Sequence, residues 1–556
     1  MSLEDASSTP GAADSPPSID DTPASTRART PLWPFLCLLL ALGWTVLLRV
    51  PLVINAGAHL DSDVSVDGIT LIELLEGKFR WHYPGTPHIG IAPVLASLPQ
   101  ALVFGVGPET LISGGVVIWM LVVVACFALS WRSDGPIAAC GALVPLTFAS
   151  TGLIWLSGRI TGGHLLSVAM HAGIFLGLQL VAARPTLLRA AALGVWAGLS
   201  LWVDQMAIVS LAALVPAAGY LWWRRGRPIS AVRLVVAFVI GLPIGLAPRI
   251  IGNRVDPYDA YGEQFTAIWD ERELQRHTRL LIMDCLPRLV AGHRIPSLLA
   301  DPSPSMIPSS PIQPVERDRR GTFDEVPAHL AAILFVAAML CVLDLRGSPE
   351  AGAVRIGLLA ACAATAATFI INRNIFNSDN YRYLVFFIVP WALGSGRALE
   401  RLGRLGSGGA GLAMLSVAVF AGVMTVDARN WYARYGWVDG WKPVVAKVER
   451  DELEWLEQHP EVDAIVGNYW EVYLHTFLTG GRVKGVPFAV YPNRFPEWSA
   501  YWPGSRPQYI FVAFGRSFEG RSYRAAAERD GGAAVFQGRR IWIVHWPGDK
   551  EIPVTP

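Results

Sequence analysis

Apolar stretches of about twenty residues recur along most of this chain of 556 residues. A helix of that length crosses the hydrocarbon core of a bilayer, so each stretch is a candidate transmembrane segment. Only 16% of the residues are charged, against about 25% in soluble domains. The sequence therefore predicts a polytopic α-helical membrane protein. The candidate segments are 33–54, 111–131, 136–156, 163–183, 190–203, 206–223, 231–251, 327–345, 354–371, 382–400 and 409–427.

A further apolar stretch, 89–105, is short and contains Pro93 and Pro99. Because proline interrupts a helix, this stretch is expected to be a re-entrant or juxtamembrane element unless it forms another crossing. The predicted number of transmembrane helices is therefore eleven to thirteen.

Positive charge in short loops orients the segments, because such loops remain in the cytoplasm. If all the basic loops are cytoplasmic, the segments alternate consistently. The predicted parts are a disordered cytoplasmic tail (1–30), a transmembrane domain (31–427) with extracytoplasmic loops 55–110 and 252–326, and an extracytoplasmic domain (428–556). The basic loops contain Arg27, Arg29, Arg132, Arg184, Arg189, Arg224, Arg225, Arg346, Arg355, Arg397, Arg401 and Arg404.

The C-terminal part changes in composition and predicts a small α/β domain. Residues 445–459 have a helical pattern, and 463–469, 508–514 and 539–546 have the pattern of strands. A net charge of +1 gives no reason to expect nucleic acid. No phosphate-binding P-loop or Gly-rich dinucleotide motif is present in the sequence, so a cytosolic nucleotide is not expected to be the direct substrate.

Three aspartates crowd the stretch "HLDSDVSVDGITLIELLEGKF" (59–79), directly after the first apolar segment. A structural interpretation is a helix cap at "DSD", with Asp67 on the solvated face of the following helix. A functional interpretation is a general base, Asp63 or Asp61, that deprotonates an acceptor. A carboxylate here is also suited to bind a divalent cation. The residues alone leave these interpretations open.

A second polar cluster lies in "NSDNYRYLVFFIVPW" (377–391), at the expected outer end of a segment. Asp379 and Arg382 lie beside Tyr381 and Tyr383. An ordinary membrane interface, with belt tyrosines and a snorkelling arginine, explains the pattern. Alternatively, Arg382 binds a lipid phosphate, because a guanidinium offers a fork of donors that matches phosphate oxygens.

Two further external stretches carry unusual polar residues. Arg159 and His164 in "SGRITGGH" (157–164) are candidates to join Arg382, although a lone histidine is more often a packing residue. Asp204 lies in "WVDQ" (202–205), between two short apolar stretches, and predicts the outward tip of a helical hairpin. Charges at such depth usually line a cavity, and a tight polar turn is the alternative.

These motifs resemble the GT-C superfamily of membrane glycosyltransferases, in the bacterial branch related to protein O-mannosyltransferases and lipid A aminoarabinose transferases. The first loop "DVSVDGITLIELLEGKF" and the turn "PGTPHIG" (84–90) correspond to motifs of that branch, as do "RYL" (382–384) and "NYWEVYLHTFLTGGRV" (468–483). Members often have an Asp-Glu pair in the first loop, where this chain has Asp63 and Val64.

The resemblance implies a bacterial inner-membrane enzyme of GT-C fold that acts outside the cytoplasm. It implies inverting transfer of a sugar, a hexose or a pentose, from a polyprenyl-phosphate donor to an envelope glycan, lipid or protein. By its spacing to Gly68, Asp63 is the expected base, with Asp61 as the second choice. No cofactor is implied with certainty, and a divalent cation stays open. The donor phosphate is expected at Arg382, Arg159 and His164, and other substrate contacts at His82, Tyr83, His88, Asp204, Asp379 and Tyr381.

Two other classes of protein stay open at this stage. A transporter or flippase of a lipid-linked sugar also needs many segments and intramembrane charge, but typically has internal repeats, which the sequence lacks. A non-catalytic scaffold in envelope assembly is the other alternative.

Overall fold

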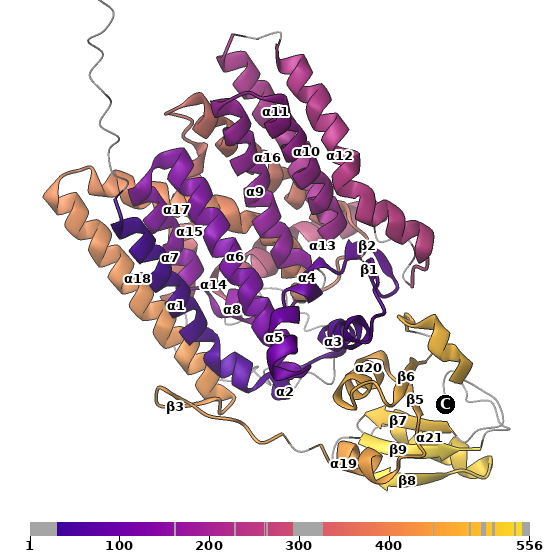
Figure 1. Ribbon diagram of the computed structural model, residues 1–556. Helices are drawn as coiled ribbons and strands as arrows, with labels where there is room; N and C mark the ends of the chain where they lie inside the picture. The colour runs from indigo at the N-terminus through magenta and orange to yellow at the C-terminus, as the bar shows by residue number, and fades with distance from the viewer. Residues whose placement is uncertain are drawn as a thin grey trace, which may run out of the picture.

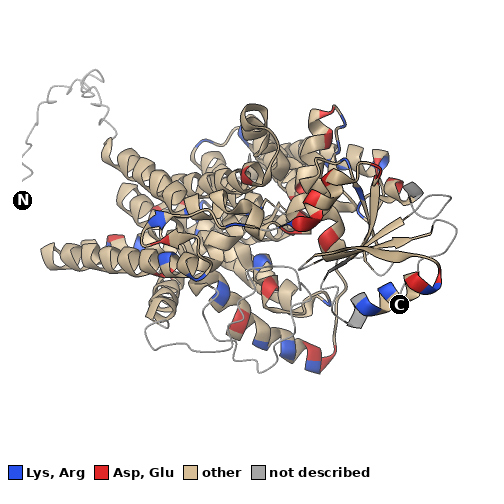
Figure 2. Cartoon of the chain, turned by 90° about the horizontal axis from the view of Figure 1, so that it is seen from below, with Lys and Arg blue, Asp and Glu red and all other residues tan. Residues whose placement is uncertain are grey.

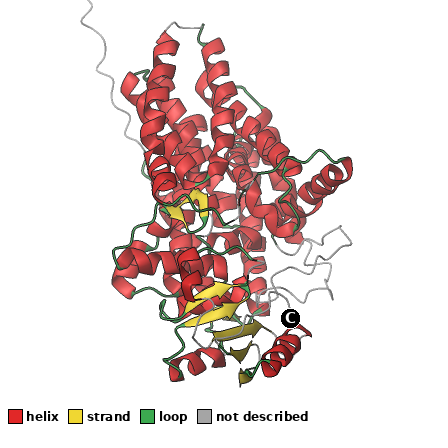
Figure 3. Ribbon diagram, turned by 90° about the vertical axis from the view of Figure 1, so that its right-hand side faces the viewer, coloured by secondary structure: helices red, strands yellow, loops and turns green. Residues whose placement is uncertain are grey.

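The computed structural model describes residues 31–160, 163–226, 230–260, 262, 265–292, 326–448, 450–488, 491–501, 508–513, 518–538 and 541–547. The predicted tail 1–30 and residues 293–325 of the external loop lie outside this part of the chain. A bundle of long helices fills most of the molecule, and a small sheet lies at one end of it (Figures 1 and 3). The long helices are free of charged residues over most of their length (Figure 2).

Eight helices of the described residues are long and apolar enough to cross a membrane. A ninth crossing is present if α7 (Pro136–Thr147) and α8 (Thr151–Ser157), bent by 85°, form one span. The eight are α1 (Trp33–Ile54), α6 (Pro108–Asp134), α9 (His164–Ala183), η2 with α11 (Gln205–Ala207 and Ile208–Arg224), α12 (Ser230–Val255), α15 (Val326–Leu343), α16 (Pro349–Ile371) and α18 (Ser407–Arg434).

Two shorter helices complete the correspondence with the sequence. They are α10 (Leu187–Val203) and α17 (Ile388–Gly403), which follows the 3-10 helix η5 (Ser378–Phe387). Each of the eleven predicted segments therefore coincides with helix, and the helical membrane fold is confirmed. By length and composition, eight or nine helices span, fewer than the eleven to thirteen predicted.

The proline-containing stretch 89–105 does not cross the bundle. It forms the end of β2 (Thr86–Gly90) and two short helices, α4 (Ala92–Leu95) and α5 (Leu98–Phe104). Each helix has its proline in the first turn, where the missing N–H leaves no intrahelical bond unmade. The stretch therefore forms no helix long enough to span a membrane, which agrees with the expectation that it is not a full crossing.

Ion pairs join the helix ends at one end of the bundle. Arg355 Nη2 and Arg397 Nη1 each donate to Asp134 Oδ1 at 2.6 Å, and Arg397 also reaches Asp344 at 3.2 Å. These side chains connect the ends of α6, α15, α16 and α17, and all but Asp344 are buried. The basic loops predicted to be cytoplasmic therefore meet at this end, with charges paired inside the protein.

At the opposite end lie the elements of the two loops that the sequence predicts to be extracytoplasmic. The first loop contains α2 (Ala56–His59), α3 (Ser62–Leu75) and an antiparallel hairpin of β1 (His82–Tyr83) with β2. The loop before α15 forms α13 (Glu271–Leu280), a π-helical turn η3 (Leu281–Cys285) and α14 (Leu286–Ala291). Helix α14 packs against α8, α15 and η5.

The C-terminal domain contains a five-stranded mixed sheet in the order β6-β5-β7-β9-β8. Three strands were predicted from the sequence: β5 (Ala464–Gly467), β7 (Gln508–Ala513) and β9 (Ile541–Trp546). The other two, β6 (Lys484–Pro487) and β8 (Ala533–Gln537), were not predicted. The helix predicted over 445–459 begins only at α19 (Asp451–Gln458). Helix α20 (Tyr469–Leu478) packs on α3, while α21 (Phe518–Arg529) packs on β7, β8 and β9.

The Asp134 network yields a stability prediction. Asp134→Ala removes the carboxylate shared by the two buried guanidinium groups, so we expect a loss of about 3–5 kcal/mol of stability. The midpoint of thermal unfolding of the purified protein in detergent measures it. Arg404→Ala breaks only the exposed pair with Glu400 and is expected to cost about 0.5 kcal/mol or less. Equal midpoints for Asp134→Ala and the unmodified protein would contradict the prediction.

A buried pair in the C-terminal domain predicts a pH effect. Burial alone raises the pKa of Glu452, but the hydrogen bond and charge of His475, 3.2 Å away, outweigh it and lower the pKa to about 2. A depressed carboxyl pKa stabilises the fold above the unfolded pKa and loses that contribution as pH falls through the folded pKa. The gap in unfolding midpoint between the unmodified protein and Glu452→Gln is therefore expected to shrink from pH 4.5 toward pH 2. A constant gap over that range excludes the pair as its cause.

Candidate active site

Asp61 caps α3 and orients an arginine. Its Oδ1 accepts the Val64 N–H at 3.0 Å, so the predicted helix cap is present. Its Oδ2 forms an ion pair with Arg159, whose guanidinium also lies over the Trp155 ring, 4.1 Å from the ring centre. Both oxygens of Asp61 are therefore engaged by protein donors.

Asp63 lies where the first loop meets the C-terminal domain. The Tyr469 hydroxyl donates to its Oδ1 at 2.7 Å, and Arg494 Nη2 lies 3.9 Å from the same oxygen. The Tyr83 hydroxyl donates to the backbone carbonyl of Asp63 at 2.7 Å. The side chain remains 15% exposed, so Asp63 is held by protein contacts and still reachable from solvent.

The contact of α3 with α20 explains two other residues of the first loop. Asp67 is 1% exposed, so its predicted place on a solvated face is wrong, because α3 packs against α20, α4 and α6. At Gly68 an added Cβ would lie 2.3 Å from the Phe477 ring and 2.8 Å from Leu111. Only a residue without a side chain permits this close approach.

Arginines gather around Tyr381, whose hydroxyl donates to the Gly152 carbonyl at 3.1 Å. Arg159, Arg288 and Arg382 all interact electrostatically with this phenol. Arg288 is paired with Asp379 at 2.7 Å, and Arg382 interacts electrostatically with Asp63. The structure thus joins Asp63 and the predicted phosphate-binding arginines in one region.

Two donors in this cluster stand out. The Nε–H groups of Arg159 and Arg382 are buried and donate to no group of the described residues. A buried donor without a partner costs about 1–3 kcal/mol, and more when charged. An anionic ligand between these guanidinium groups would supply the missing acceptors.

Asp204 and His164 form a buried pair. Asp204 Oδ2 lies 2.8 Å from His164 Nδ1, and its Oδ1 accepts the Met206 N–H at 2.8 Å. The backbone of Asp204 also bridges to Ile89 in β2. Asp204 lies at the connection between α10 and α11, as predicted, but α10 packs mainly on α12 and α11 mainly on α16, so the two helices do not form the expected packed hairpin. Asp204 itself is buried, whereas Gln205 beside it is exposed. The His164 ring meets the Tyr383 ring edge-on, with 5.3 Å between the ring centres. Because Tyr383 directly follows Arg382 in the sequence, the His164–Asp204 pair lies near the segment that carries Arg382.

The two histidines of the β1–β2 hairpin, His82 and His88, are neutral at physiological pH. Burial lowers the pKa of His82 and lowers that of His88 to about 4. They can hydrogen-bond a substrate but supply no positive charge. Positive charge in this region therefore comes from the arginines.

Three residues of the region escaped the sequence analysis: Arg288, Tyr469 and Arg494. Arg288 lies in the long loop before α15, where its pairing with Asp379 gave no local signal. Tyr469 lies in a motif that resembled the family but pointed to no side chain. Only their long-range contacts reveal them.

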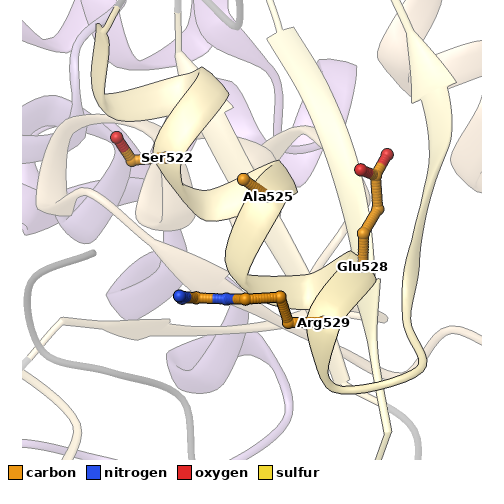
Figure 4. Close-up of a pocket in the computed structure, with 4 residues that line it drawn as sticks. All are labelled: Ser522, Ala525, Glu528 and Arg529. Atoms are coloured by element: carbon orange, nitrogen blue, oxygen red, sulfur yellow. The ribbon is translucent and has the colours of Figure 1, made fainter.

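Metal sites and cavities contribute less. Among the described residues, no group of three or more His, Cys, Asp or Glu side chains is placed to hold a metal ion. A hollow of about 550 Å³ beside α21 is lined by Ser522, Ala525, Glu528 and Arg529 (Figure 4). It lies on the helix that does not contact α3, so it is separate from the Asp63 region.

The fold of this chain, a helical membrane bundle with a small sheet-containing domain at one end, is that of GT-C membrane glycosyltransferases of known structure. Its structure is similar to ArnT from Cupriavidus metallidurans bound to undecaprenyl phosphate, with a TM-score of 0.59 and 12% identity over 92% of this chain and 98% of that one. The apo state of the same protein gives a TM-score of 0.58 at 13% identity, over 92% of this chain and 97% of that one.

The archaeal oligosaccharyltransferase AglB from Archaeoglobus fulgidus, in complex with an inhibitory peptide and a dolichol-phosphate, is also similar. Its TM-score is 0.52 at 12% identity, over 86% of this chain and 69% of that chain. No family model and no curated protein matches the sequence. The GT-C resemblance of the sequence motifs is therefore confirmed for the fold.

Gly68 yields a prediction for the docking of the C-terminal domain. Gly68→Ala adds a methyl group against Phe477, and overpacking of this kind costs about 1–3 kcal/mol. We expect α20 to dock less tightly on α3 in this variant. Trypsin is then expected to cleave after Lys447, in the segment between β4 (Lys442–Pro443) and α19, several-fold faster than in the unmodified protein. Gly57→Ala is the control, because an added Cβ there meets no atom within 4 Å. Equal cleavage of the two variants would refute the packing argument.

Proposed function

We propose that this protein is an inverting glycosyltransferase that moves a sugar from a polyprenyl-phosphate donor to an acceptor outside the cytoplasm. The single observation that supports it best is that a reachable carboxylate, Asp63, lies in one region with arginines whose buried Nε–H groups donate to nothing in the described part of the chain. A base beside an anion site is what transfer from a glycosyl phosphate requires.

In the proposed reaction, Asp63 accepts the proton of the acceptor hydroxyl or amine. The acceptor atom forms a bond to the anomeric carbon from the face opposite the phosphate. The bond between that carbon and the phosphate oxygen breaks, and the lipid phosphate leaves with the electron pair. Arg382 and Arg159 stabilise the charge that develops on it. One carboxylate is sufficient for this step, so Val64 in place of a second acid is no obstacle.

His164 and its neighbours have supporting roles in this proposal. Asp204 orients the His164 ring through a hydrogen bond of 2.8 Å. Tyr381 is held among the arginines by the hydrogen bond that its hydroxyl donates to the Gly152 carbonyl. His82, Tyr83 and His88 line the first loop as neutral sugar contacts, and Asp379 keeps Arg288 in position. Asp61 positions Arg159 instead of serving as the base.

The lipid carrier and the orientation rest on further support. The similar ArnT structure holds undecaprenyl phosphate, and the AglB structure holds a dolichol-phosphate. The ion-paired basic loops lie at the end away from Asp63, and basic loops remain in the cytoplasm. We therefore propose a bacterial inner membrane location with an extracytoplasmic site. The sugar is a hexose or pentose, and the acceptor is a glycan, lipid or protein of the envelope.

Asp63→Asn tests the proposal. The amide keeps the shape of the side chain but accepts a proton poorly, so we expect transfer to fall by about 10²–10⁴-fold. The assay incubates purified protein with a panel of polyprenyl-phosphate hexoses and pentoses and an envelope fraction. Mass spectrometry follows the release of polyprenyl phosphate and the mass gained by the acceptor. Asp439→Asn, on an exposed residue of β3 (Val438–Asp439), is the control.

Three outcomes would count against the proposal. Unchanged transfer by Asp63→Asn removes the catalytic role of that residue. Movement of labelled donor lipid across vesicles without any sugar transfer identifies a transporter, and the absence of both activities leaves the scaffold.

A further inference from the structure

We propose that the C-terminal domain forms part of the catalytic site, with Tyr469 and Arg494 as positioning residues that fix which oxygen of Asp63 meets the acceptor. The inference rests on the proposed function, since it gives Asp63 the part of the base. It goes beyond that function because it assigns a role to a domain that lies outside the helical bundle.

Tyr469 is anchored before it reaches Asp63. It is the first residue of α20, and the side chain of Asn468 caps this helix by accepting the Trp470 N–H at 2.9 Å. The Ser62 hydroxyl donates to the Tyr469 carbonyl at 2.8 Å, beside the aspartate itself in sequence. The phenol is therefore fixed relative to α3 when it donates to Asp63 Oδ1 at 2.7 Å.

Arg494 holds the same oxygen from a second direction. Its guanidinium lies over the rings of Tyr83 and Tyr469, with centroid distances of 4.9 and 5.8 Å. Its Nε donates to the Tyr469 hydroxyl at 3.2 Å, and its Nη1 donates to the Pro84 carbonyl at 3.3 Å. The side chain is only 7% exposed. A buried guanidinium needs a nearby carboxylate, and Asp63, at 3.9 Å, fills that need.

Both contacts engage Oδ1, which decides the chemistry available to Asp63. With Oδ1 bound by the C-terminal domain, Oδ2 is the oxygen left to receive a proton from the acceptor. A base must lie within hydrogen-bond reach of the proton that it removes, and small displacements of a reacting group reduce rates strongly. The domain thus selects one rotamer of Asp63 and holds it.

The experiment removes one hydroxyl and keeps the ring. Tyr469→Phe loses the bond to Oδ1 and also the acceptor of the Arg494 Nε–H, but it retains the aromatic ring beside the Arg494 guanidinium. We expect kcat to fall about ten- to a hundredfold while KM for the polyprenyl-phosphate sugar stays within about twofold, because the donor is bound by other residues. Tyr509→Phe is the matched control, since it also removes a tyrosine hydroxyl of this domain while its ring packs against Trp455 and His545.

A charge-conserving pair of variants provides the second measurement. Arg494→Lys keeps a cation near Asp63 and is expected to retain more of kcat than Arg494→Met, whereas a merely structural role predicts similar losses for both. Unchanged kcat in Tyr469→Phe, or a rise in KM alone, overturns the inference. If Asp63→Asn is inactive while Tyr469→Phe is fully active, the proposed function stands and only this inference fails. If the unmodified protein transfers no sugar from the panel, the proposed function itself fails.

Discussion

The pairing of buried arginines with aspartates is the interaction on which both ends of this molecule depend. At one end, Asp134 holds the two guanidinium groups that join four helices. At the other, Asp61, Asp379 and Asp63 each face one arginine, namely Arg159, Arg288 and Arg494. Isolated charges are costly in a low-dielectric interior, so each pair also fixes the elements that carry it. The guanidinium of Arg382 lies over the Tyr383 ring, 5.4 Å from its centre, and its buried Nε–H donates to no group of the described residues.

Much of the bundle was predictable because its signals are local. A membrane span is written in about twenty consecutive residues, so each segment was found where the helix lies. Loop charge predicted which helix ends meet, and the ion pairs of Arg225, Arg355 and Arg397 agree with it. The number of spans was overestimated, since α7 ends in an 85° bend and α10 has only 17 residues. Apolarity marks such helices without revealing how they are bent.

The site was only half predictable, because its contacts join residues far apart in the chain. Asp63 and Arg382 carry local motifs, and the sequence named both. Tyr469 lies 406 positions from Asp63, and Arg288 lies 91 from Asp379, so no pattern within a window could pair them. The prediction that Asp67 is solvated failed for the same reason, since the helix that carries Asp67, α3, packs against a helix of the C-terminal domain. The cap at Asp61 was correct because it depends on the next three residues alone.

The order of synthesis gives the separation between Asp63 and its holders a further meaning. The ribosome completes α3 early, and Tyr469 is added only 406 positions after Asp63. During that time the membrane-inserted chain carries its aspartate with neither the phenol nor the guanidinium that engage Oδ1 in the finished fold. The region is complete only after the C-terminal domain has been made and has folded onto the first loop. A nascent or C-terminally truncated chain therefore occupies the membrane with Asp63 unrestrained.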